Sequence, residues 1–303
     1  MTPRHFLTLA DLSPAVLGKL IQRAIELKAG HQRGERHVPL VGRTMAMMFE
    51  KSSTRTRVSF EAGMAQLGGS SMFLPPRDLQ LGRGEPIEDT ARVISRMVDV
   101  IVIRANEHAM VERFAGHSQV PVINALTELH HPCQLLADVQ TVVERRGEVR
   151  GRTVAWVGDG NNVCHSWMQA AKVFDFELRV ATPPGYAPRP DIAAACAPNA
   201  RLLADPSAAV ARADVVVTDT WASMGQEHEK AERAKAFAPY RVDRELMRKA
   251  KPDAIFMHCL PAYRGHEVTA EVIDGPQSVV WDEAENRLHS QKALLELLLQ
   301  PSR

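Results

Sequence analysis

The chain has almost no excess of positive or negative charge. Its 303 residues include 37 basic and 36 acidic side chains, which gives a formal net charge of +1. Domains that bind nucleic acids usually carry a clear basic excess on one face. The balanced charge therefore argues against a nucleic acid as partner.

Long apolar runs are missing as well. No stretch approaches the ~18 apolar residues that a membrane-spanning helix needs, and the residues that follow Met1 form no apolar core of a secretory signal. With 45% hydrophobic and 24% charged residues, the composition is typical of a globular protein. The length predicts two domains with sizeable cores.

The chain also lacks closely spaced cysteine pairs. The chain has four cysteines, and none of them forms a Cys-x-x-Cys pair, so the sequence indicates neither a zinc site nor a redox motif. They are Cys133, Cys164, Cys196 and Cys259. We expect free thiols in a reducing cytoplasm.

Apolar runs alternate with helical patterns along the chain, which is typical of an α/β fold with parallel sheets. We expect two domains, each a parallel sheet flanked by helices. A short glycine-flanked turn at 147–151 marks the junction, so we place one domain at 1–147, joined by a C-terminal helix at 288–303, and the other at 148–287. The expected strands are 44–49, 70–74, 100–104, 120–124, 153–157, 177–181, 215–218, 255–258 and 278–281.

The stretch Ser-Ser-Thr-Arg-Thr-Arg at 52–57 carries the strongest functional signal. It follows a strand-like apolar run at 45–49 and opens a segment whose apolar residues, Phe60, Met64 and Leu67, recur at helical spacing. A helix N-terminus offers unpaired N–H groups and a partial positive charge.

The side chains of this stretch suit an anion. Ser53, Thr54 and Thr56 add neutral donors, while Arg55 and Arg57 add forked, permanently charged ones. The pattern predicts a phosphate site. The alternative is a capped helix with two solvent-exposed arginines.

Further polar groups follow other expected strands, where ligands of open parallel sheets bind. Arg104 ends one strand, and its alternative role is that of a surface arginine. His131 precedes a long helix and would donate to an oxyanion, or serve in a capping segment. Arg287 follows the last expected strand, with a surface salt bridge as the alternative.

A glycine-rich turn follows the strand at 153–157. Gly158 and Gly160 resemble part of a dinucleotide fingerprint, but Val163 stands where its third glycine belongs. The sequence favours a nicotinamide cofactor only weakly. Asn161 and Asn162 would instead offer amides to a polar substrate.

Two later strand ends carry an acid and a thiol. Asp219 would pair with a substrate ammonium, or cap a turn. Cys259 would be a nucleophile with His258 as base, but adjacent residues of an extended segment point in opposite directions. We therefore prefer Cys259 as a positioning or polarising group, and a buried apolar thiol is the alternative.

Four of these motifs, in this order, resemble the aspartate/ornithine transcarbamoylase family. Two belong to the whole family, and two resemble its ornithine branch. The motifs are Ser53-Thr54-Arg55-Thr56-Arg57 with Ser59-Phe60-Glu61, His131-Pro132-x-Gln134, Asp219-x-Trp221-x-Ser223-Met224-Gly225 and His258-Cys259-Leu260-Pro261. The similarity runs from about Phe6 to Leu299.

The resemblance implies an active site in the cleft between two α/β domains and a homotrimer whose sites are shared between subunits. For carbamoyl phosphate it implies Ser53, Thr54, Arg55, Thr56, Gln80 of a neighbouring subunit, Arg104, His131, Gln134, Cys259, Leu260 and Arg287. For ornithine it implies Asn162, Asp219, Ser223 and Met224. Arg104, His131, Asp219 and Cys259 are the residues that it marks as catalytic.

The implied reaction is attack by the neutral δ-amine of ornithine on the carbamoyl carbon. Thr56, Arg104 and His131 would stabilise the tetrahedral oxyanion before phosphate leaves. Neither a metal nor an organic cofactor is required. The implied role is arginine biosynthesis, shared with the urea cycle.

The alternatives are transfer to another amine, such as an acylated ornithine or putrescine, phosphorolysis of citrulline, a nicotinamide-dependent dehydrogenase, and a silent carbamoyl-phosphate sensor.

Overall fold

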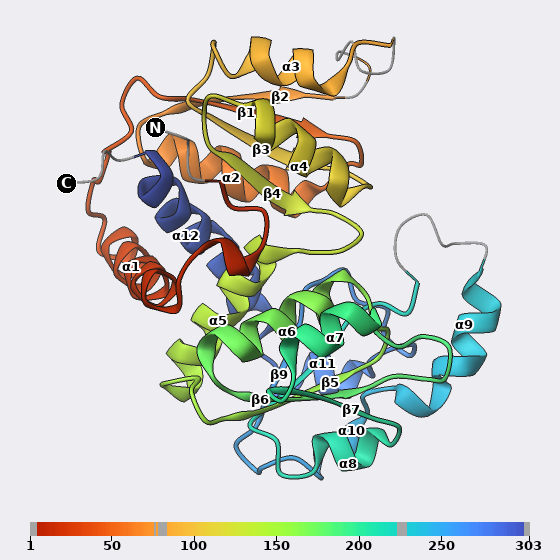
Figure 1. The fold of residues 1–303 in the computed structure, drawn as a ribbon. Coiled ribbons are helices and arrows are strands. Elements are labelled where there is room, and N and C mark those ends of the chain that lie inside the picture. The colour runs from red at the N-terminus through yellow and green to blue at the C-terminus, as the bar shows by residue number, and fades with distance from the viewer. Residues whose placement is uncertain (1–4, 76, 78–83, 223–228, 300–303) are drawn as a thin grey trace. The chain divides into compact units, whose positions relative to one another are not determined.

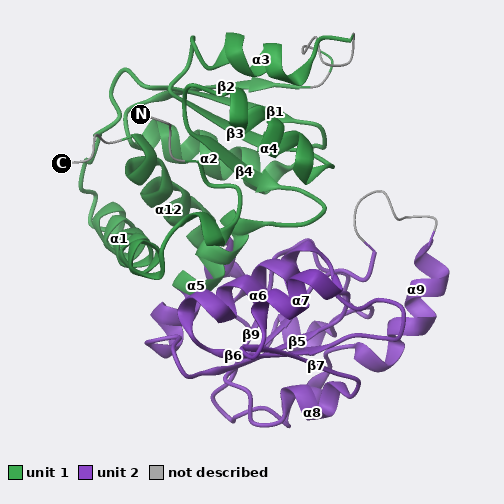
Figure 2. Cartoon of the chain, in the orientation of Figure 1, with its two compact units in different colours: residues 1–140, 285–303 green, residues 141–284 purple. Residues whose placement is uncertain are grey.

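The computed structural model describes residues 5–75, 77, 84–222 and 229–299. The chain divides into two compact units, unit 1 (1–140 and 285–303) and unit 2 (141–284), shown in Figure 2. Among the described residues, no helix has both the length and the apolar character of a membrane span.

Unit 1 is built on a four-stranded parallel sheet of order β2-β1-β3-β4. Its strands are β1 (Thr44–Phe49), β2 (Ser70–Leu74), β3 (Val100–Arg104) and β4 (Val122–Leu126). The helices around it are η1 (Leu9–Asp11) and, labelled in Figure 1, α1 (Pro14–Gln32), α2 (Thr54–Gln66), α3 (Ile87–Ile94), α4 (His108–His117), α5 (Pro132–Arg146) and α12 (Val280–Leu299).

Unit 2 is built on a five-stranded parallel sheet of order β7-β6-β5-β8-β9. Its strands are β5 (Thr153–Val157), β6 (Glu177–Ala181), β7 (Ala200–Leu203), β8 (Val215–Thr218) and β9 (Ile255–His258). Figure 2 shows α6 and α7 on one face of this sheet and α8 on the other. The helices are α6 (Asn162–Phe174), α7 (Pro190–Cys196), α8 (Pro206–Val210), α9 (Lys230–Phe237), η5 (Ala238–Tyr240), α10 (Arg244–Met247) and α11 (Ala270–Ile273).

The inner strands β1, β3, β5 and β8 are nearly continuous apolar runs, as expected of parallel strands that are covered on both faces. Every residue of β3 is buried, as is every residue of β8. Local signals agree with this packing: Ser13 caps α1 and Pro14 occupies its first position, where a missing N–H costs nothing.

Two expectations about the elements were wrong, and the strand expected at 120–124 lies two residues later, as β4 (Val122–Leu126). The segment 278–281 is not a strand, because α12 begins at Val280; the adjacent β-branched residues Val279 and Val280 imitated one. The strand β7 (Ala200–Leu203) was missed, because it is only four residues long and Arg201 interrupts its apolar pattern.

The units divide within α5 and α12, after residues 140 and 284, whereas the sequence placed the divisions after 147 and 287. The glycine-flanked turn at 147–151 connects α5 to β5 inside unit 2. A continuous helix gives no break in composition at which a boundary could be recognised. The difference assigns Arg287 to unit 1.

Candidate functional site

The N-terminus of α2 has the form expected of an anion site. Ser53 is the N-cap, and its Oγ accepts the N–H of Thr56 at 3.4 Å. Thr54 and Arg55 are exposed on the first turn, while Thr56 is buried. The first turn thus combines a helix-dipole end with hydroxyls and a guanidinium.

Arg57, two residues further on, has other partners. Its Nε donates to Glu61 Oε1 at 2.9 Å, and its guanidinium lies 4.1 Å from the centre of the Phe73 ring. The expectation that Arg57 also serves the anion is therefore corrected, because helical geometry turns it to a different face from Arg55.

A buried hydrogen-bond network joins α2, α5 and α12 in unit 1. Arg287 Nη1 donates to Gln134 Oε1 at 2.6 Å, and its Nη2 donates to Thr56 Oγ1 at 3.2 Å. Gln134 Nε2 donates to Asp138 Oδ1 at 2.8 Å. Arg287 therefore lies on a helix rather than after a strand, and its position beside Thr56 is set by tertiary packing.

His131 stands among positive charges in the same unit. Burial lowers the pKa of His131 well below the usual range for histidine, and it is the largest cause of this shift. The charges of Arg287, Arg104 and Arg55 lower that pKa further. His131 is therefore neutral near pH 7, and the nearby arginines supply the positive charge of this region.

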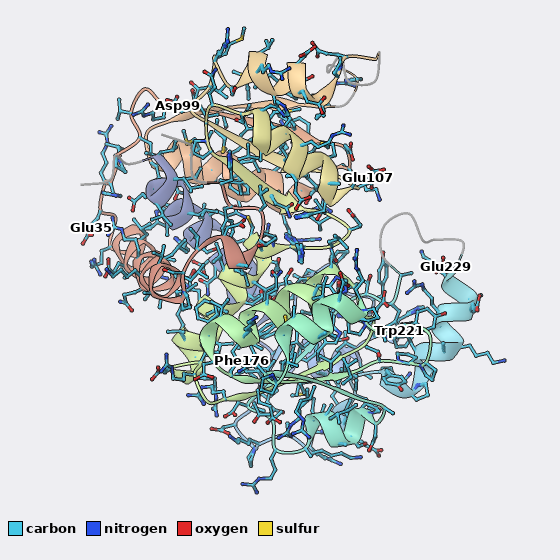
Figure 3. The ribbon with its side chains drawn as sticks, viewed as in Figure 1. Glu35, Asp99, Glu107, Phe176, Trp221 and Glu229 are labelled. Carbon is cyan, nitrogen blue, oxygen red and sulfur yellow. The ribbon has the colours of Figure 1, made fainter. Side chains whose placement is uncertain are left out.

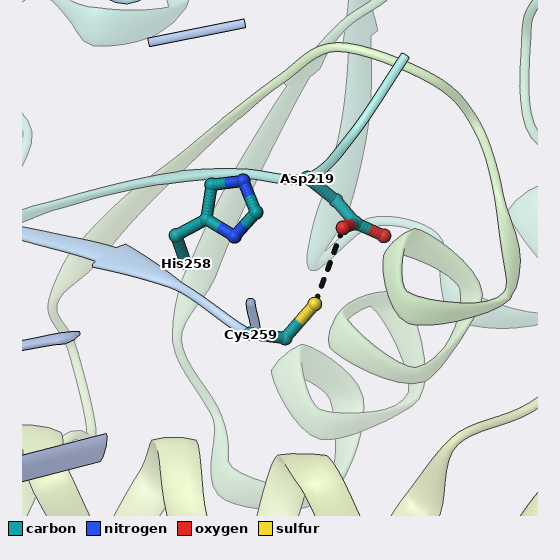
Figure 4. Close-up of side chains that lie close together, drawn as sticks. All are labelled: Asp219, His258 and Cys259. Carbon is teal, nitrogen blue, oxygen red and sulfur yellow. Dashed lines mark hydrogen bonds between the residues drawn. The ribbon is translucent and has the colours of Figure 1, made fainter. Parts of the chain in front are cut away.

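In unit 2, an acid at the end of β8 collects donors from the two neighbouring strands. Asp219 Oδ1 accepts a hydrogen bond from the thiol of Cys259, which follows β9, at 3.2 Å (Figure 4). Its Oδ2 accepts Asn161 Nδ2, which follows β5, at 2.7 Å. The order β5-β8-β9 brings these three chain segments to one edge of the sheet. The Cys259 sulfur thus lies within hydrogen-bond distance of the acid.

Asn161 was expected to offer its amide to a substrate, and the structure shows a different role for it. Its Oδ1 accepts the N–H groups of Val163 and Cys164, so it caps α6 as well as holding Asp219. Asn162, the residue expected to bind ornithine, begins α6.

Asp219, His258 and Cys259 each place one potential metal-ligand atom within 4.8 Å of the others. His258 Nδ1, however, accepts the N–H of Leu260 at 2.9 Å, and its Nε2 lies 3.2 Å from Glu267 Oε1. Both ring nitrogens thus have protein partners, so the donor set fits a hydrogen-bond network better than a metal centre.

Two residues of unit 2 were missed by the sequence reasoning. Buried Arg233 donates to Asp159 Oδ2 at 3.0 Å, to the carbonyl of Trp221 at 2.9 Å and to Glu229 Oε2 at 2.7 Å; Figure 3 labels Trp221 and Glu229. Burial raises the pKa of Asp159 to about 6, although Arg233 opposes the rise. Asp159 lies at a strand end, which was a usable signal, whereas nothing near Arg233 in the sequence marks it.

The glycine-rich turn after β5 does not have the space of a dinucleotide cradle. A methyl group at Gly160 would lie 2.2 Å from the backbone nitrogen of Pro188, and the Gly160 N–H donates to the carbonyl of Tyr186. In the fingerprint, glycine lets a pyrophosphate approach the backbone. Here the loop that contains Tyr186 and Pro188 occupies the space beside Gly160 that a pyrophosphate would need. This packing argues against the dehydrogenase alternative.

Three expected site residues lie outside the described part of the chain: Gln80, Ser223 and Met224. The remaining expected residues are divided between the two units. The unit 1 set comprises Ser53, Thr54, Arg55, Thr56, Arg104, His131, Gln134 and Arg287, and the unit 2 set comprises Asn162, Asp219, Cys259 and Leu260.

The two halves of the chain match two family models. Residues 4–144 match the carbamoyl-phosphate-binding domain of the aspartate/ornithine carbamoyltransferases, and residues 150–298 match their Asp/Orn-binding domain. Among curated proteins, the chain is similar to the ornithine carbamoyltransferase of Nitrosococcus oceani, with 62% identity over 99% of this chain and 98% of that protein. The corresponding protein of Halorhodospira halophila is 61% identical over 98% of this chain and 99% of its own length.

Solved structures agree. The ornithine carbamoyltransferase of Burkholderia thailandensis E264 is 55% identical, with a TM-score of 0.91 over 98% of each chain. That of Pyrococcus furiosus is 50% identical, with a TM-score of 0.94 over 100% of this chain and 99% of the other. The chain belongs to the aspartate/ornithine carbamoyltransferase family.

Proposed function

We propose that this member of the family transfers the carbamoyl group of carbamoyl phosphate to the δ-amine of L-ornithine, giving L-citrulline and phosphate. The observation that carries the proposal is the presence of both residue sets in a chain that matches named ornithine carbamoyltransferases over nearly its whole length. Unit 1 supplies cations for a phosphate, and unit 2 supplies an acid for an ammonium group.

Carbamoyl phosphate is proposed to bind the unit 1 set. Arg55 and the first turn of α2 bind the phosphate. Thr56 Oγ1 already accepts an N–H of Arg287, so its own proton is directed to a different acceptor. Thr56, Arg104 and His131 are proposed to donate to the oxygens on which charge develops.

Ornithine is proposed to bind the unit 2 set through its α-amino-acid end, with Asp219 paired to the α-ammonium group. The δ-amine must lose its proton before it attacks, because an ammonium has no lone pair. Its nitrogen then bonds to the carbamoyl carbon, the C–O bond to phosphate breaks, and phosphate leaves with the electron pair. The attacking nitrogen, which is positively charged once the C–N bond has formed, releases a second proton to the departing phosphate. Cys259 hydrogen-bonds in this reaction and forms no covalent intermediate.

The decisive experiment is a citrulline assay with the purified full chain, carbamoyl phosphate and a series of amines. We expect citrulline from ornithine and no comparable product from putrescine or Nα-acetylornithine, because both lack a free α-amino-acid end. Absence of citrulline would contradict the proposal. Comparing this rate with arsenolysis of citrulline distinguishes a biosynthetic from a degradative role, and we propose the biosynthetic one, leading to arginine.

We also propose a homotrimer in a reducing cytoplasm, as the resemblance implies. Unit 1 exposes several large apolar side chains that another copy would cover. They are Val41, Val58, Met72, Val93 and Met97, exposed by 43–75%. Light scattering measures the assembly.

Site sharing has its own test. Gln80→Ala and Asp219→Asn chains are mixed, unfolded and refolded together. Recovered activity supports sharing, whereas an inactive mixture of folded trimers contradicts it.

A further inference from the structure

The turn after β9 has an unusual backbone at Leu260. Its φ is +59°, in the left-handed region that a leucine rarely adopts. Its side chain is partly buried against the hydrophobic core of unit 2. Such a conformation persists only where the surrounding structure imposes it, so the contacts that hold this turn are of interest.

His258 supplies the first of these contacts. The Leu260 N–H donates to His258 Nδ1 at 2.9 Å, and because a backbone N–H is always a donor, Nδ1 must carry the lone pair. The ring proton is therefore on Nε2, which donates to Glu267 Oε1 at 3.2 Å. The side chains of His258 and Glu267 are 0% and 1% exposed, so this tautomer is fixed away from water.

The ring is held from both sides. Glu267 Oε1 also accepts the N–H of Tyr263 at 2.6 Å, which ties the ring to the far side of the same loop. The backbone N–H of His258 donates to Glu283 Oε2 at 2.9 Å. His258 is thus a rigid bridge between the end of β9 and the loop that follows it.

We propose that His258 is a positioning residue, which sets the Leu260 turn through Nδ1 and so directs the Cys259 thiol to Asp219. It is not the base of a His–Cys pair, because each ring nitrogen is engaged with another group. The inference rests on the proposed function, in which Cys259 and Leu260 line the reacting centre and Asp219 binds ornithine.

Two substitutions separate the ring nitrogens. Asparagine places an acceptor oxygen near the position of Nδ1 and lacks the distal donor. Glutamine places an amide donor near the position of Nε2 and lacks the proximal acceptor. We expect H258N to keep the ornithine KM and turnover within about threefold of the wild type. H258Q should raise the ornithine KM by at least about tenfold, the effect of losing one buried hydrogen bond, with the carbamoyl-phosphate KM unchanged.

Glu267→Gln tests the same idea without touching the histidine. Positioning needs only the acceptor oxygen that receives both donors, so we expect kinetics within about threefold of the wild type. A base supported by a carboxylate would instead lose turnover by orders of magnitude when that carboxylate becomes an amide. His266→Asn, at an exposed histidine of the same loop, is the matched control and should be unchanged.

Thermal midpoints accompany each assay. Equal, severe turnover losses in folded H258N and H258Q would overturn the proposal in favour of a base, and wild-type kinetics in both would overturn any role. If H258Q does not fold, an inactive but folded H258N or Glu267→Gln still overturns it. Failure of the wild type to make citrulline counts against the proposed function, whereas these variants are compared only in an active enzyme.

Discussion

The guanidinium of Arg287 donates to the amide oxygen of Gln134 at 2.6 Å, although 153 residues separate them in the chain. The same guanidinium reaches Thr56 at the start of α2. These bonds fix the direction of the Gln134 amide and leave the Thr56 proton for another acceptor. A helix that begins in unit 2 thus contributes Arg287 to the unit 1 set.

Arg287→Lys should raise the carbamoyl-phosphate KM by at least about tenfold, because an ammonium cannot reproduce two forked donors. The ornithine KM should stay within about twofold. Steady-state kinetics with each substrate varied measure the difference. Arg145→Lys, at the exposed ion pair with Asp282, is the control and should leave both values unchanged.

Arg55→Ala should weaken carbamoyl-phosphate binding by about one to two decades, since a charge-assisted phosphate contact contributes roughly 1.5–3 kcal/mol. Arg57→Ala removes the same side chain two residues later and should leave that affinity nearly unchanged, because Arg57 pairs with Glu61 and stacks on Phe73. Calorimetric titration with carbamoyl phosphate compares the two. Equal losses would place both arginines at the phosphate.

Asp219→Asn should chiefly damage the use of ornithine and spare carbamoyl phosphate. The variant loses the negative charge for the α-ammonium group, and it offers Cys259 and Asn161 an amide in place of a carboxylate. We expect an ornithine KM raised by at least about tenfold, a loss of roughly 1.5–3 kcal/mol. Equal loss of both substrates in initial-rate kinetics would indicate a structural role instead.

Cys259→Ser should keep the fold, reduce turnover and weaken ornithine binding, with carbamoyl phosphate still bound. Steady-state kinetics with each substrate varied measure these changes.

Wild-type turnover should rise with pH through the alkaline range, because an alkylammonium with a pKa near ~10.4 is only about one part in 10³ neutral at pH 7. Intact-protein mass spectrometry of a quenched enzyme and carbamoyl phosphate mixture checks the direct mechanism. A stoichiometric mass gain on Cys259 would contradict it.

The free energy of unfolding of unit 2 should fall as pH rises from about 4 to 6, because of Asp159. Burial raises its folded-state pKa to about 6 from an ordinary 3.8, so the folded state binds the proton more tightly than the unfolded chain does. The stabilisation is fully present below the pKa of the unfolded state and is lost as the pH rises through the pKa of the folded state. The loss in free energy of unfolding is on the order of 3 kcal/mol. Urea unfolding at pH 4 and pH 7 measures it, and Asp159→Asn should flatten the difference. An unchanged slope in this variant would assign the effect to another group.

Much of this protein is determined by sequence alone. Buried parallel strands are continuous apolar runs, so eight of the nine strands of the two sheets were recognised, seven of them with their bounds. Strand ends also predicted roles for Arg104, Asp219 and Cys259, and the start of a long helix predicted one for His131; these roles stay predictions. These signals are local, because hydrogen bonding within an element and burial of one segment depend on neighbouring residues.

Only the tertiary structure decided how these residues are used. It brought Arg287 to Thr56, turned Arg57 to Glu61, and engaged both nitrogens of His258. It also paired Asp159 with Arg233, across 74 residues of sequence. Such contacts join elements far apart in the chain, and their geometry depends on packing that no local pattern records. The residue types that make the chemistry are therefore legible in the sequence, whereas their partners, charges and tautomers are set by the fold.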